Sequence, residues 1–451
     1  DRKSSYTMRV FMLGWEFPPF ISGGLGTACY GLTKAMSSIG TDIMFVLPRP
    51  VATPFSTHVR LVSPRTGSEL ASPDTEFRLD EFEHVTFRTV SAQLNPYQSP
   101  AQYAEEQSAL RARRAASMAG AENGPTGERV LPPATPAANP YGGDMFTEVQ
   151  RYAALAAEIA RNESFDVVHA HDWMTFPAGL AVAGIKNRPL IVHVHSTEFD
   201  RSGIHVDQRI YDIERRGMHG ALKVIAVSHL TKNQITQQYG VDPSKVEVVY
   251  NAIDVSTNGF DEEKYKIHKD EKIVLFLGRI TMQKGPEYFL AAAKKVLEVM
   301  DNVKFVMAGS GDMIRRTIEM AAGMGIGHKV LFTGFLRGND VERVFNMADL
   351  YVMPSVSEPF GIAPLEAMSH DVPVIISKQS GVSEVLTHAL KVDFWDINEM
   401  ANKIIAVLKH PPLATTLRQH GSFEVRRLNW TDAARSCVGV YEQAKVMMNG
   451  H

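Results

Sequence analysis

The sequence predicts an α/β protein with two doubly wound parallel sheets, and three observations support that prediction. The chain has 451 residues, more than the ~100–200 of one typical domain and suited to two. Short runs rich in Val, Ile, Leu and Phe alternate with longer helical patterns, which is typical of parallel sheets covered by helices on both faces. The alternation stops in a polar, charged segment over 254–270 and then restarts, which predicts a domain boundary.

The apolar runs give the order of the expected elements. In the first half they predict strands at 9–14, 42–47, 166–171, 190–195, 223–227 and 246–250. In the second half they predict strands at 272–278, 303–308, 329–333, 350–353 and 373–376, each followed by a stretch compatible with a helix. We therefore expect Rossmann-like domains over 8–254 and 272–430, joined by a linker over 255–271. Ligands of such sheets bind at the carboxyl ends of the strands.

Two further segments differ from this alternation. Residues 91–141 contain seven prolines, a run of alanines and few large apolar residues, which predicts a long insertion in the first domain. The last residues, 431–451, have a helical pattern with apolar residues on one face. The pattern leaves open whether this helix completes the second domain or crosses back to the first.

Composition excludes several classes of partner. The chain has 47 basic and 50 acidic side chains, a formal charge of −3, so we expect no nucleic acid partner. Two cysteines, Cys29 and Cys437, are too few for a disulfide scaffold and lack the paired spacing of zinc ligands, which favours a reducing compartment. No run of ~18 apolar residues and no signal peptide is evident, so we expect a cytoplasmic protein without a transmembrane segment.

A glycine-rich turn follows the first predicted strand and precedes a helix expected from about residue 27. It contains Gly23 and Gly24. Glycine lets the backbone approach a ligand, and a helix N-terminus offers N–H donors to a phosphate. A tight turn without a ligand explains this motif equally well.

The first strand of the second domain is followed by two cations five residues apart, Arg279 and Lys284. Both could reach one diphosphate and neutralise its charge as it departs. The alternative is that they are ordinary solvent-exposed side chains of a loop.

Two carboxylates with seven residues between them, Glu358 and Glu366, follow the strand predicted at 350–353. Carboxylates accept hydrogen bonds from sugar and ribose hydroxyls, and the backbone N–H groups near Phe360 and Gly361 could bind a phosphate or hydroxyl. A surface charge at a helix end is the alternative, which the intervening Pro-Phe-Gly makes less plausible.

Together these residues resemble the retaining, two-domain glycosyltransferases of the glycogen/starch synthase and sucrose-synthase-like superfamily, over about residues 8–441. The resemblance implies the GT-B architecture, in which two Rossmann-like domains face each other across a cleft. It assigns Arg279 and Lys284 to the diphosphate of a nucleotide sugar. It also assigns Glu358 and the loop after it to the donor sugar, and Glu366 to the ribose.

The same resemblance implies roles for further residues. Its donor-binding positions include Gly23, Gly24, Gly309, Phe360, Gly361 and Ile362. His195 corresponds to the active-site histidine that contacts the sugar near the reacting carbon, and Asp172 lies on the acceptor side. Two positions depart from the bacterial glycogen synthases, because Ile21 stands where enzymes using ADP-glucose have Lys, and Met174 where they have His.

The expected activity is transfer of a sugar, glucose in the first instance, from ADP-glucose or UDP-glucose to an acceptor hydroxyl with retention at the anomeric carbon. The resemblance favours elongation of an α-glucan. We expect no metal and no cofactor, because two cations already serve the diphosphate. The open alternatives are a small-sugar or lipid-linked acceptor, an epimerase or phosphorylase-like enzyme, and an inactive relative that binds sugar nucleotides or glucan. The glycine spacing of dinucleotide-binding dehydrogenases is missing after Gly14, which disfavours that class.

Overall fold

The computed structural model describes residues 7–17, 24–48, 59–62, 75–79, 84–90, 92, 94, 108, 144–255 and 271–450. Most of the expected insertion over 91–141, most of the expected linker, and Gly23 and Ile21 lie outside these residues. The chain divides into two compact units. The first contains Asp1–Val192, Arg216–Lys223 and Tyr441–His451, and the second contains His193–Arg215 and Val224–Val440. The domain boundaries expected from the sequence remain predictions.

The described residues form two sheets, and the predicted fold class is confirmed. The first sheet has the strand order β3-β4-β5-β2-β1-β6-β7-β8-β9. Its strands are β1 (Arg9–Leu13), β2 (Asp42–Pro48), β3 (Val59–Val62), β4 (Thr75–Leu79), β5 (Val85–Val90), β6 (Val167–His171), β7 (Leu190–Val194), β8 (Lys223–Ala226) and β9 (Val246–Val248). Strand β1 pairs in parallel with β2 and β6, as the alternating pattern predicts.

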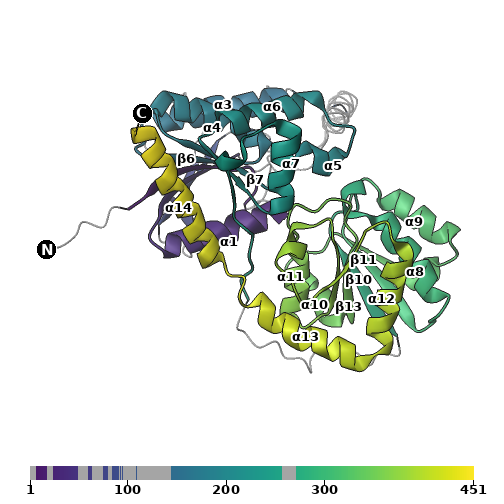
Figure 1. Cartoon of the computed structure of the whole chain (residues 1–451). Helices are drawn as coiled ribbons and strands as arrows, with labels where there is room; N and C mark the ends of the chain where they lie inside the picture. The colour runs from purple at the N-terminus through teal and green to yellow at the C-terminus, as the bar shows by residue number, and fades with distance from the viewer. Residues whose placement is uncertain are drawn as a thin grey trace, which may run out of the picture. The chain divides into compact units, whose positions relative to one another are not determined.

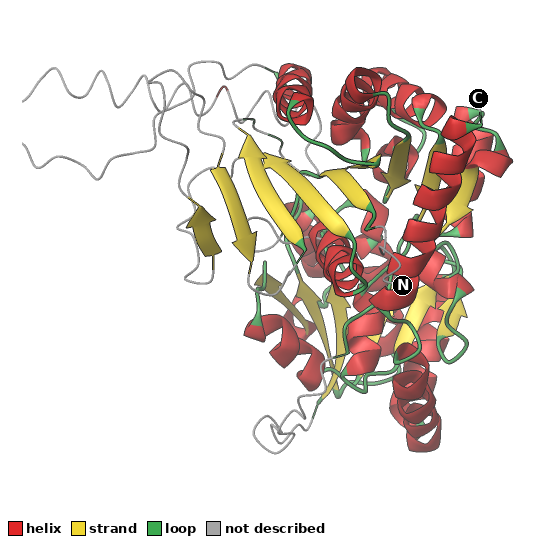
Figure 2. Ribbon diagram, turned by 90° about the vertical axis from the view of Figure 1, so that its left-hand side faces the viewer, coloured by secondary structure: helices red, strands yellow, loops and turns green. Residues whose placement is uncertain are grey.

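One edge of the first sheet differs from the prediction of purely parallel strands. Strands β3 and β4 pair antiparallel, and so do β4 and β5 (Figure 2). Strands β3, β4 and β5 were not predicted. In the sequences TEFRL and VTFRTV, Thr, Glu and Arg interrupt the apolar residues, so these strands are not continuous apolar runs.

The second sheet has the strand order β12-β11-β10-β13-β14-β15. Its strands are β10 (Lys272–Leu277), β11 (Val303–Ala308), β12 (Val330–Gly334), β13 (Leu350–Met353), β14 (Val374–Ser377) and β15 (Leu390–Val392). The described pairings in this sheet are all parallel. Strand order reverses between β10 and β13, so the switch point of the sheet lies there.

Helices connect the strands. They are α1 (Gly24–Ser38), α3 (Met145–Arg161), α4 (Phe176–Lys186), α5 (Glu198–Ser202), α6 (Gln208–Gly220), α7 (His229–Tyr239), α8 (Pro286–Leu297), α9 (Ile314–Gly323), α10 (Asn339–Met347), α11 (Ala363–Ser369), α12 (Ile397–Lys409), α13 (Pro411–Val425) and α14 (Trp430–Asn449). Short 3-10 turns include η1 (Trp173–Thr175), η4 (Met282–Lys284) and η6 (Gly381–Glu384). None of the described helices is long and apolar enough to cross a membrane.

The second sheet is covered on both faces. Apolar side chains of α8, α9 and α12 pack with one set of buried strand residues, and those of α10 and α11 pack with another (Figure 1). In the first unit, α3 and α4 lie on one face of the sheet and α1 on the other (Figure 1). This double layering leaves the loops after each strand as the exposed ends of a rigid core.

The end of α14 belongs to the first unit. The hydroxyl of Tyr441 lies at hydrogen-bond distance from Nδ1 of His169, at the centre of β6. Lys445 Nζ forms an ion pair with Asp166 at 3.1 Å. Tyr441 and Ala444 are fully buried, so this part of the helix packs into a core.

Candidate active site

The turn after β11 approaches the turn after β10 so closely that Gly309 has no room for a side chain. Gly278 has φ +156 and Gly309 has φ +143. A Cβ atom on Gly309 would lie 1.8 Å from the carbonyl oxygen of Gly278. Gly278 N–H donates to Ala308 at 3.0 Å, and Gly309 N–H donates to Gly334 at 2.9 Å. The close approach of the two backbones therefore requires a glycine at position 309, whether or not a nucleotide binds there.

The next residues of both turns continue this contact. Ile280 N–H donates to Ser310 at 2.9 Å, and Met313 N–H donates back to Ile280 at 3.0 Å. A Cβ on Gly311 would lie 2.3 Å from the Ile280 carbonyl oxygen. The segment that contains Arg279 is therefore fixed by its neighbours on either side.

Gln283 ties the cation-bearing turn to the loop after β13. Its buried side chain donates from Nε2 to the Ser357 carbonyl at 3.0 Å. Its own carbonyl accepts from Val356 N–H at 2.9 Å. Arg279 Nη2 donates to Gln283 Oε1 at 3.2 Å. One glutamine therefore holds Arg279 on one side and the segment leading to Glu358 on the other.

Lys284 and Glu358 form an ion pair, with Nζ donating to Oε2. The Glu358 residue is only 7% exposed, and the same carboxylate oxygen accepts from Ser355 Oγ at 3.3 Å. Burial strengthens the attraction between two opposite charges because water screens them less. The structure thus brings together the second predicted cation and the first predicted carboxylate, which are 74 residues apart in sequence.

Backbone hydrogen bonds hold the loop of Glu358 against the segment after β14. Glu358 N–H donates to Gln379 at 2.9 Å, and its carbonyl accepts from Gly381 at 2.9 Å. The carbonyl of Phe360, a buried residue, accepts from Val382 at 2.7 Å. This loop is therefore continuous with the hydrogen-bonded core.

The following residues lead into α11. Gly361 has φ +103, and a Cβ there would lie 3.2 Å from Glu358 Cγ. Ile362 is the N-cap residue of α11, and its carbonyl accepts from Glu366 N–H at 3.1 Å. Glycine is needed at 361 for the backbone conformation.

The second predicted carboxylate belongs to Glu366, one turn into α11. Its side chain is half-buried, and desolvation raises its pKa to about 7. Burial and the charges of Glu358 and Glu366 raise the pKa of Tyr351, whose hydroxyl donates to Leu277 at 3.3 Å. Both carboxylates thus act electrostatically on one buried tyrosine of β13.

His195 follows β7 and belongs to the same unit as these loops. Its ring stacks on His193, with ring centroids 4.2 Å apart. The residue is partly exposed, whereas His193 is buried. His195 therefore lies at a strand's carboxyl end, where ligands of such sheets bind.

The first unit contains Gly24 and Asp172, and the loops above belong to the second. Gly24 is the first residue of α1, so this helix starts three residues earlier than expected. Asp172 directly follows β6, is 4% exposed, and has φ +59 and ψ 171. Its carbonyl accepts from Thr175 Oγ1 at 3.0 Å. Such backbone angles are costly for a residue with a side chain and cluster at functional sites.

Two buried carboxylates, Glu16 and Asp172, act on the thiol of Cys29. Burial raises the pKa of the Cys29 thiol, and the charges of Glu16 and Asp172 raise it further. Glu16 is 1% exposed. Burial also lowers the pKa of His171 to about 3, so its imidazole is neutral. The predicted acceptor-side residue therefore lies among buried polar groups.

Sequence reasoning did not assign Gly278, Gly285, Gln283 or Glu16. Gly285 has φ +67, and a Cβ there would lie 2.1 Å from the Pro354 carbonyl oxygen. The sequence does indicate a turn at Gly285, because a Gly-Pro pair precedes and opens α8. A buried glutamine and a buried glutamate have no comparable sequence signature, because their burial depends on tertiary packing.

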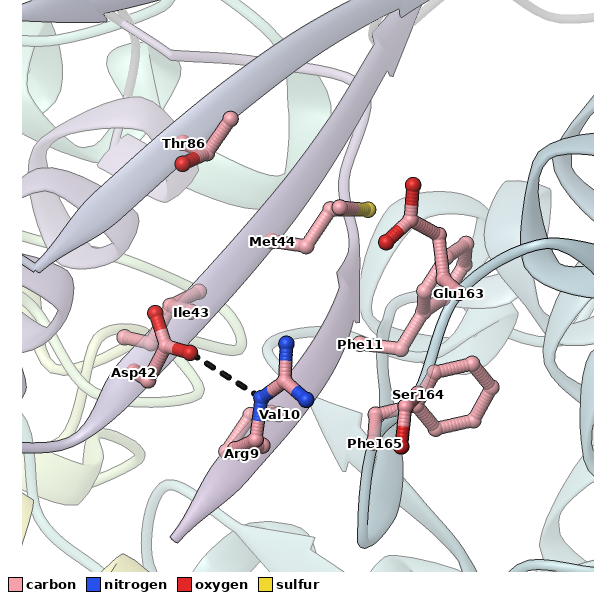
Figure 3. A pocket seen from close by; sticks show the side chains of 10 residues that line it. All are labelled: Arg9, Val10, Phe11, Asp42, Ile43, Met44, Thr86, Glu163, Ser164 and Phe165. Carbon is pink, nitrogen blue, oxygen red and sulfur yellow. Dashed lines mark hydrogen bonds and ion pairs between the residues drawn. The ribbon is translucent and has the colours of Figure 1, made fainter. Parts of the chain in front are cut away.

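A hollow of about 240 Å³ lies elsewhere in the first unit, at the amino ends of the strands (Figure 3). Arg9 and Asp42, the first residues of β1 and β2, form an ion pair across it at 3.1 Å. Figure 3 shows Glu163 and Met44 beside it. The residues predicted to bind the donor all follow the carboxyl ends of strands, so this hollow is a different place.

Comparison with known proteins identifies the class. Consecutive segments match family models described as starch synthase catalytic domain over residues 9–121, glycosyltransferase family 4 over 107–257 and glycosyl transferases group 1 over 258–422. The sucrose-phosphate synthase of Thermosynechococcus elongatus matches in structure with a TM-score of 0.70 and 19% identity, over 97% of this chain and 98% of that one. The starch synthase IV catalytic domain of Arabidopsis thaliana, bound to ADP and acarbose, matches with a TM-score of 0.69 and 14% identity, over 98% and 100%. The fold is that of the GT-B glycosyltransferases.

Sequence relatives extend along the whole chain. An uncharacterised glycosyltransferase of Methanocaldococcus jannaschii is 28% identical, over 98% of this chain and 100% of its own. The glycogen synthase of Mycobacterium tuberculosis is 23% identical, over 97% and 95%. The matched family models describe glycosyltransferases and a starch synthase catalytic domain, and the chain has the GT-B fold and homology to the glycogen and starch synthases.

Proposed function

We propose that this glycosyltransferase is a retaining enzyme that transfers glucose from a nucleoside diphosphate donor to a hydroxyl of an α-glucan. One observation carries the proposal. Two cations and two carboxylates, Arg279, Lys284, Glu358 and Glu366, follow the carboxyl ends of β10 and β13, at the switch point of the second sheet. The glucan acceptor is supported by the match to the starch synthase model and by the glycogen synthase relative.

In this proposal the diphosphate contacts Arg279 and Lys284. As the bond between the anomeric carbon and the diphosphate oxygen breaks, negative charge grows on that oxygen, and two cations stabilise it. The acceptor oxygen attacks the anomeric carbon from the face that the diphosphate leaves. The acceptor proton passes to a diphosphate oxygen, so no carboxylate nucleophile is required.

The remaining predicted residues bind around the sugar and the nucleoside. Glu358 and the backbone of Phe360, Gly361 and Ile362 contact the donor sugar. Glu366 accepts from the ribose hydroxyls, and Gly309 permits close approach of the nucleotide. As the resemblance implies, Gly23 and Gly24 are assigned to donor binding and Asp172 to the acceptor. His195 contacts the sugar near its reacting carbon.

The ion pair of Lys284 and Glu358 supports the role proposed for Lys284. The carboxylate holds the ammonium group in place, so the side-chain entropy cost is partly met before the donor binds. Because two cations already neutralise the diphosphate, we also propose that the enzyme needs no metal ion. The donor is ADP-glucose or UDP-glucose, and both are tested, because solved neighbours are bound to ADP or to UDP.

The test is a thermal-shift screen of ADP-, UDP- and GDP-sugars, followed by turnover of the best donor with and without glucan in excess chelator. We expect release of nucleoside diphosphate that depends on glucan, and NMR of the product should show an α-linkage. Turnover that occurs only with a small sugar or a lipid-linked sugar would show that the acceptor is that sugar and not an α-glucan. Donor binding without turnover on any acceptor would instead indicate an inactive relative, and loss of turnover in chelator would overturn metal independence.

A further inference from the structure

The loop that carries His195 is only three residues long. It consists of His195, Ser196 and Thr197, between the end of β7 and the start of α5. Thr197 and Asp200 form a capping box, in which Asp200 Oδ2 accepts from Thr197 N–H at 2.7 Å and from its hydroxyl at 3.1 Å. These hydrogen bonds hold the backbone at Thr197, which is two residues after His195.

The second oxygen of the same carboxylate reaches the other loop of the candidate site. Asp200 Oδ1 accepts from the hydroxyl of Ser357, the residue before Glu358. The Ser357 carbonyl accepts from Gln283, which neighbours Lys284. Asp200 and Ser357 belong to the same compact unit. One carboxylate thus bridges the His195 loop and the Glu358 loop.

The Asp200 carboxylate is buried, and neighbouring side chains are hydrogen-bonded around it. Asp200 is 3% exposed, and burial raises its pKa although Ser357, Thr197 and Arg201 each lower it. Arg201 donates from Nη1 to Ser196 Oγ at 2.8 Å and from Nη2 to the buried Glu214 at 2.6 Å. A carboxylate out of water is costly unless its oxygens are hydrogen-bonded, and both oxygens of Asp200 are.

Capping alone does not explain this arrangement. Helix α5 has five residues, too few to contribute much stability through its own hydrogen bonds. The hydrogen bond from Ser357 is not part of the capping box. It is accepted by Asp200 Oδ1, whereas the capping box uses Asp200 Oδ2.

We propose that Asp200 is a positioning residue of the glycosyl-transfer site, which holds the His195 loop and the Glu358 loop in one fixed arrangement through Thr197 and Ser357. The inference rests on the proposed function, because it assumes that both loops contact the donor. A displacement of about 1 Å in a catalytic group can lower turnover about a hundredfold.

The central variant is Ser357→Ala, which removes one hydroxyl from a partly exposed loop and keeps the capping box. Its matched control is Ser202→Ala, because the hydroxyl of Ser202 donates to Glu198 within α5, whereas that of Ser357 donates to Asp200. For Ser357→Ala we expect kcat to fall about tenfold while the donor KM changes less than twofold. Asp200→Ala should lose more, and Asp200→Asn, which can accept from Thr197 and donate to Ser357, should recover most of the loss.

Hydrogen exchange supplies a readout that needs no substrate. In Ser357→Ala, amide exchange should accelerate in both the 195–203 and the 355–361 segments, and in Ser202→Ala it should not accelerate in 355–361. Adding Ser357→Ala to Asp200→Ala should change nothing further. Exchange confined to the mutated loop, or additive losses in the double variant, would overturn the positioning role. A wild-type protein that turns over no sugar nucleotide would overturn the proposed function instead, and the exchange result would still decide whether the bridge exists.

Discussion

The strand ends of the two units differ in how they use unusual backbone angles. In the second unit, the turns after β10 and β11 place glycine at every described position with positive φ, among them Gly278, Gly285 and Gly309. In the first unit, the turn after β6 places an aspartate there, Asp172. Glycine adopts such angles without strain, whereas another residue pays about 1–3 kcal/mol. The difference indicates that the second unit needs close backbone contact at Gly285 and Gly309, where a Cβ would overlap a carbonyl oxygen, and that the first unit needs a side chain at position 172.

The largest effect should come from Lys284→Ala. If Lys284 stabilises the departing diphosphate, turnover should fall about 100- to 1,000-fold, the scale for losing one strong transition-state contact. Lys295→Ala, which removes an exposed lysine of α8, is the matched control and should leave turnover unchanged. Unchanged kcat in Lys284→Ala would contradict the role that we assign to this turn.

Substitutions of Asp172 test separately whether the first unit needs the carboxylate side chain and whether the backbone angles at this position cost stability. Asp172→Gly should relieve strain and raise the free energy of unfolding by about 1 kcal/mol, while kcat/KM for the acceptor falls about 10- to 100-fold through loss of a charged hydrogen bond. Asp172→Ala should lose the same activity without gaining stability. An Asp172→Gly variant of full activity would show that the comparison between the two units is wrong.

Gly309→Ala tests the second unit in the opposite way. The new methyl would overlap the Gly278 carbonyl, so we expect a loss of about 1–3 kcal/mol of stability, measured by chemical denaturation. The control is Gly323→Ala at the exposed end of α9, where no atom lies within 4 Å of the new Cβ. That substitution should be neutral or slightly stabilising. Equal stability in the two variants would argue against a tight backbone contact at 309.

The smallest effect should be a change in the pH dependence of stability. The folded protein raises the pKa of Glu366 from 4.5 to about 7, so between these values the folded state binds the extra proton and stability falls as pH rises. Glu366→Gln should flatten the Tm profile from about pH 4.5 to 7. In the proposed role the ionised carboxylate binds ribose, so donor affinity in the wild type should rise over the same range. A Tm profile that is identical in the variant would refute the pKa shift.

The sequence was sufficient for the double-wound architecture because long parallel strands are continuous apolar runs. Strands β10, β11 and β13 begin or end within one residue of the predicted positions. The strands β3, β4 and β5 were missed because polar residues interrupt their apolar ones, and β15 (Leu390–Val392) was missed too. The antiparallel pairs β3–β4 and β4–β5 were therefore not predicted either.

The candidate site was predictable where its residues share a local motif. Arg279 and Lys284 are close in sequence, and Glu358 and Glu366 are spaced along one loop and helix. The contacts that join these motifs are not local. Gln283 meets Ser357, and Asp200 meets Ser357 across 157 positions of sequence. Such pairings depend on tertiary packing, which a single sequence does not specify.

Calorimetry of ADP and UDP binding tests the central claim most directly. The wild type, Arg279→Ala and Lys284→Ala are compared with the exposed controls Arg315→Ala and Lys295→Ala. If the turn after β10 binds the diphosphate, the Kd of the better nucleotide should rise at least about tenfold in the first two variants, the scale for losing a hydrogen bond to a charged group. The controls should match the wild type. Equal affinity in all five proteins would contradict the account.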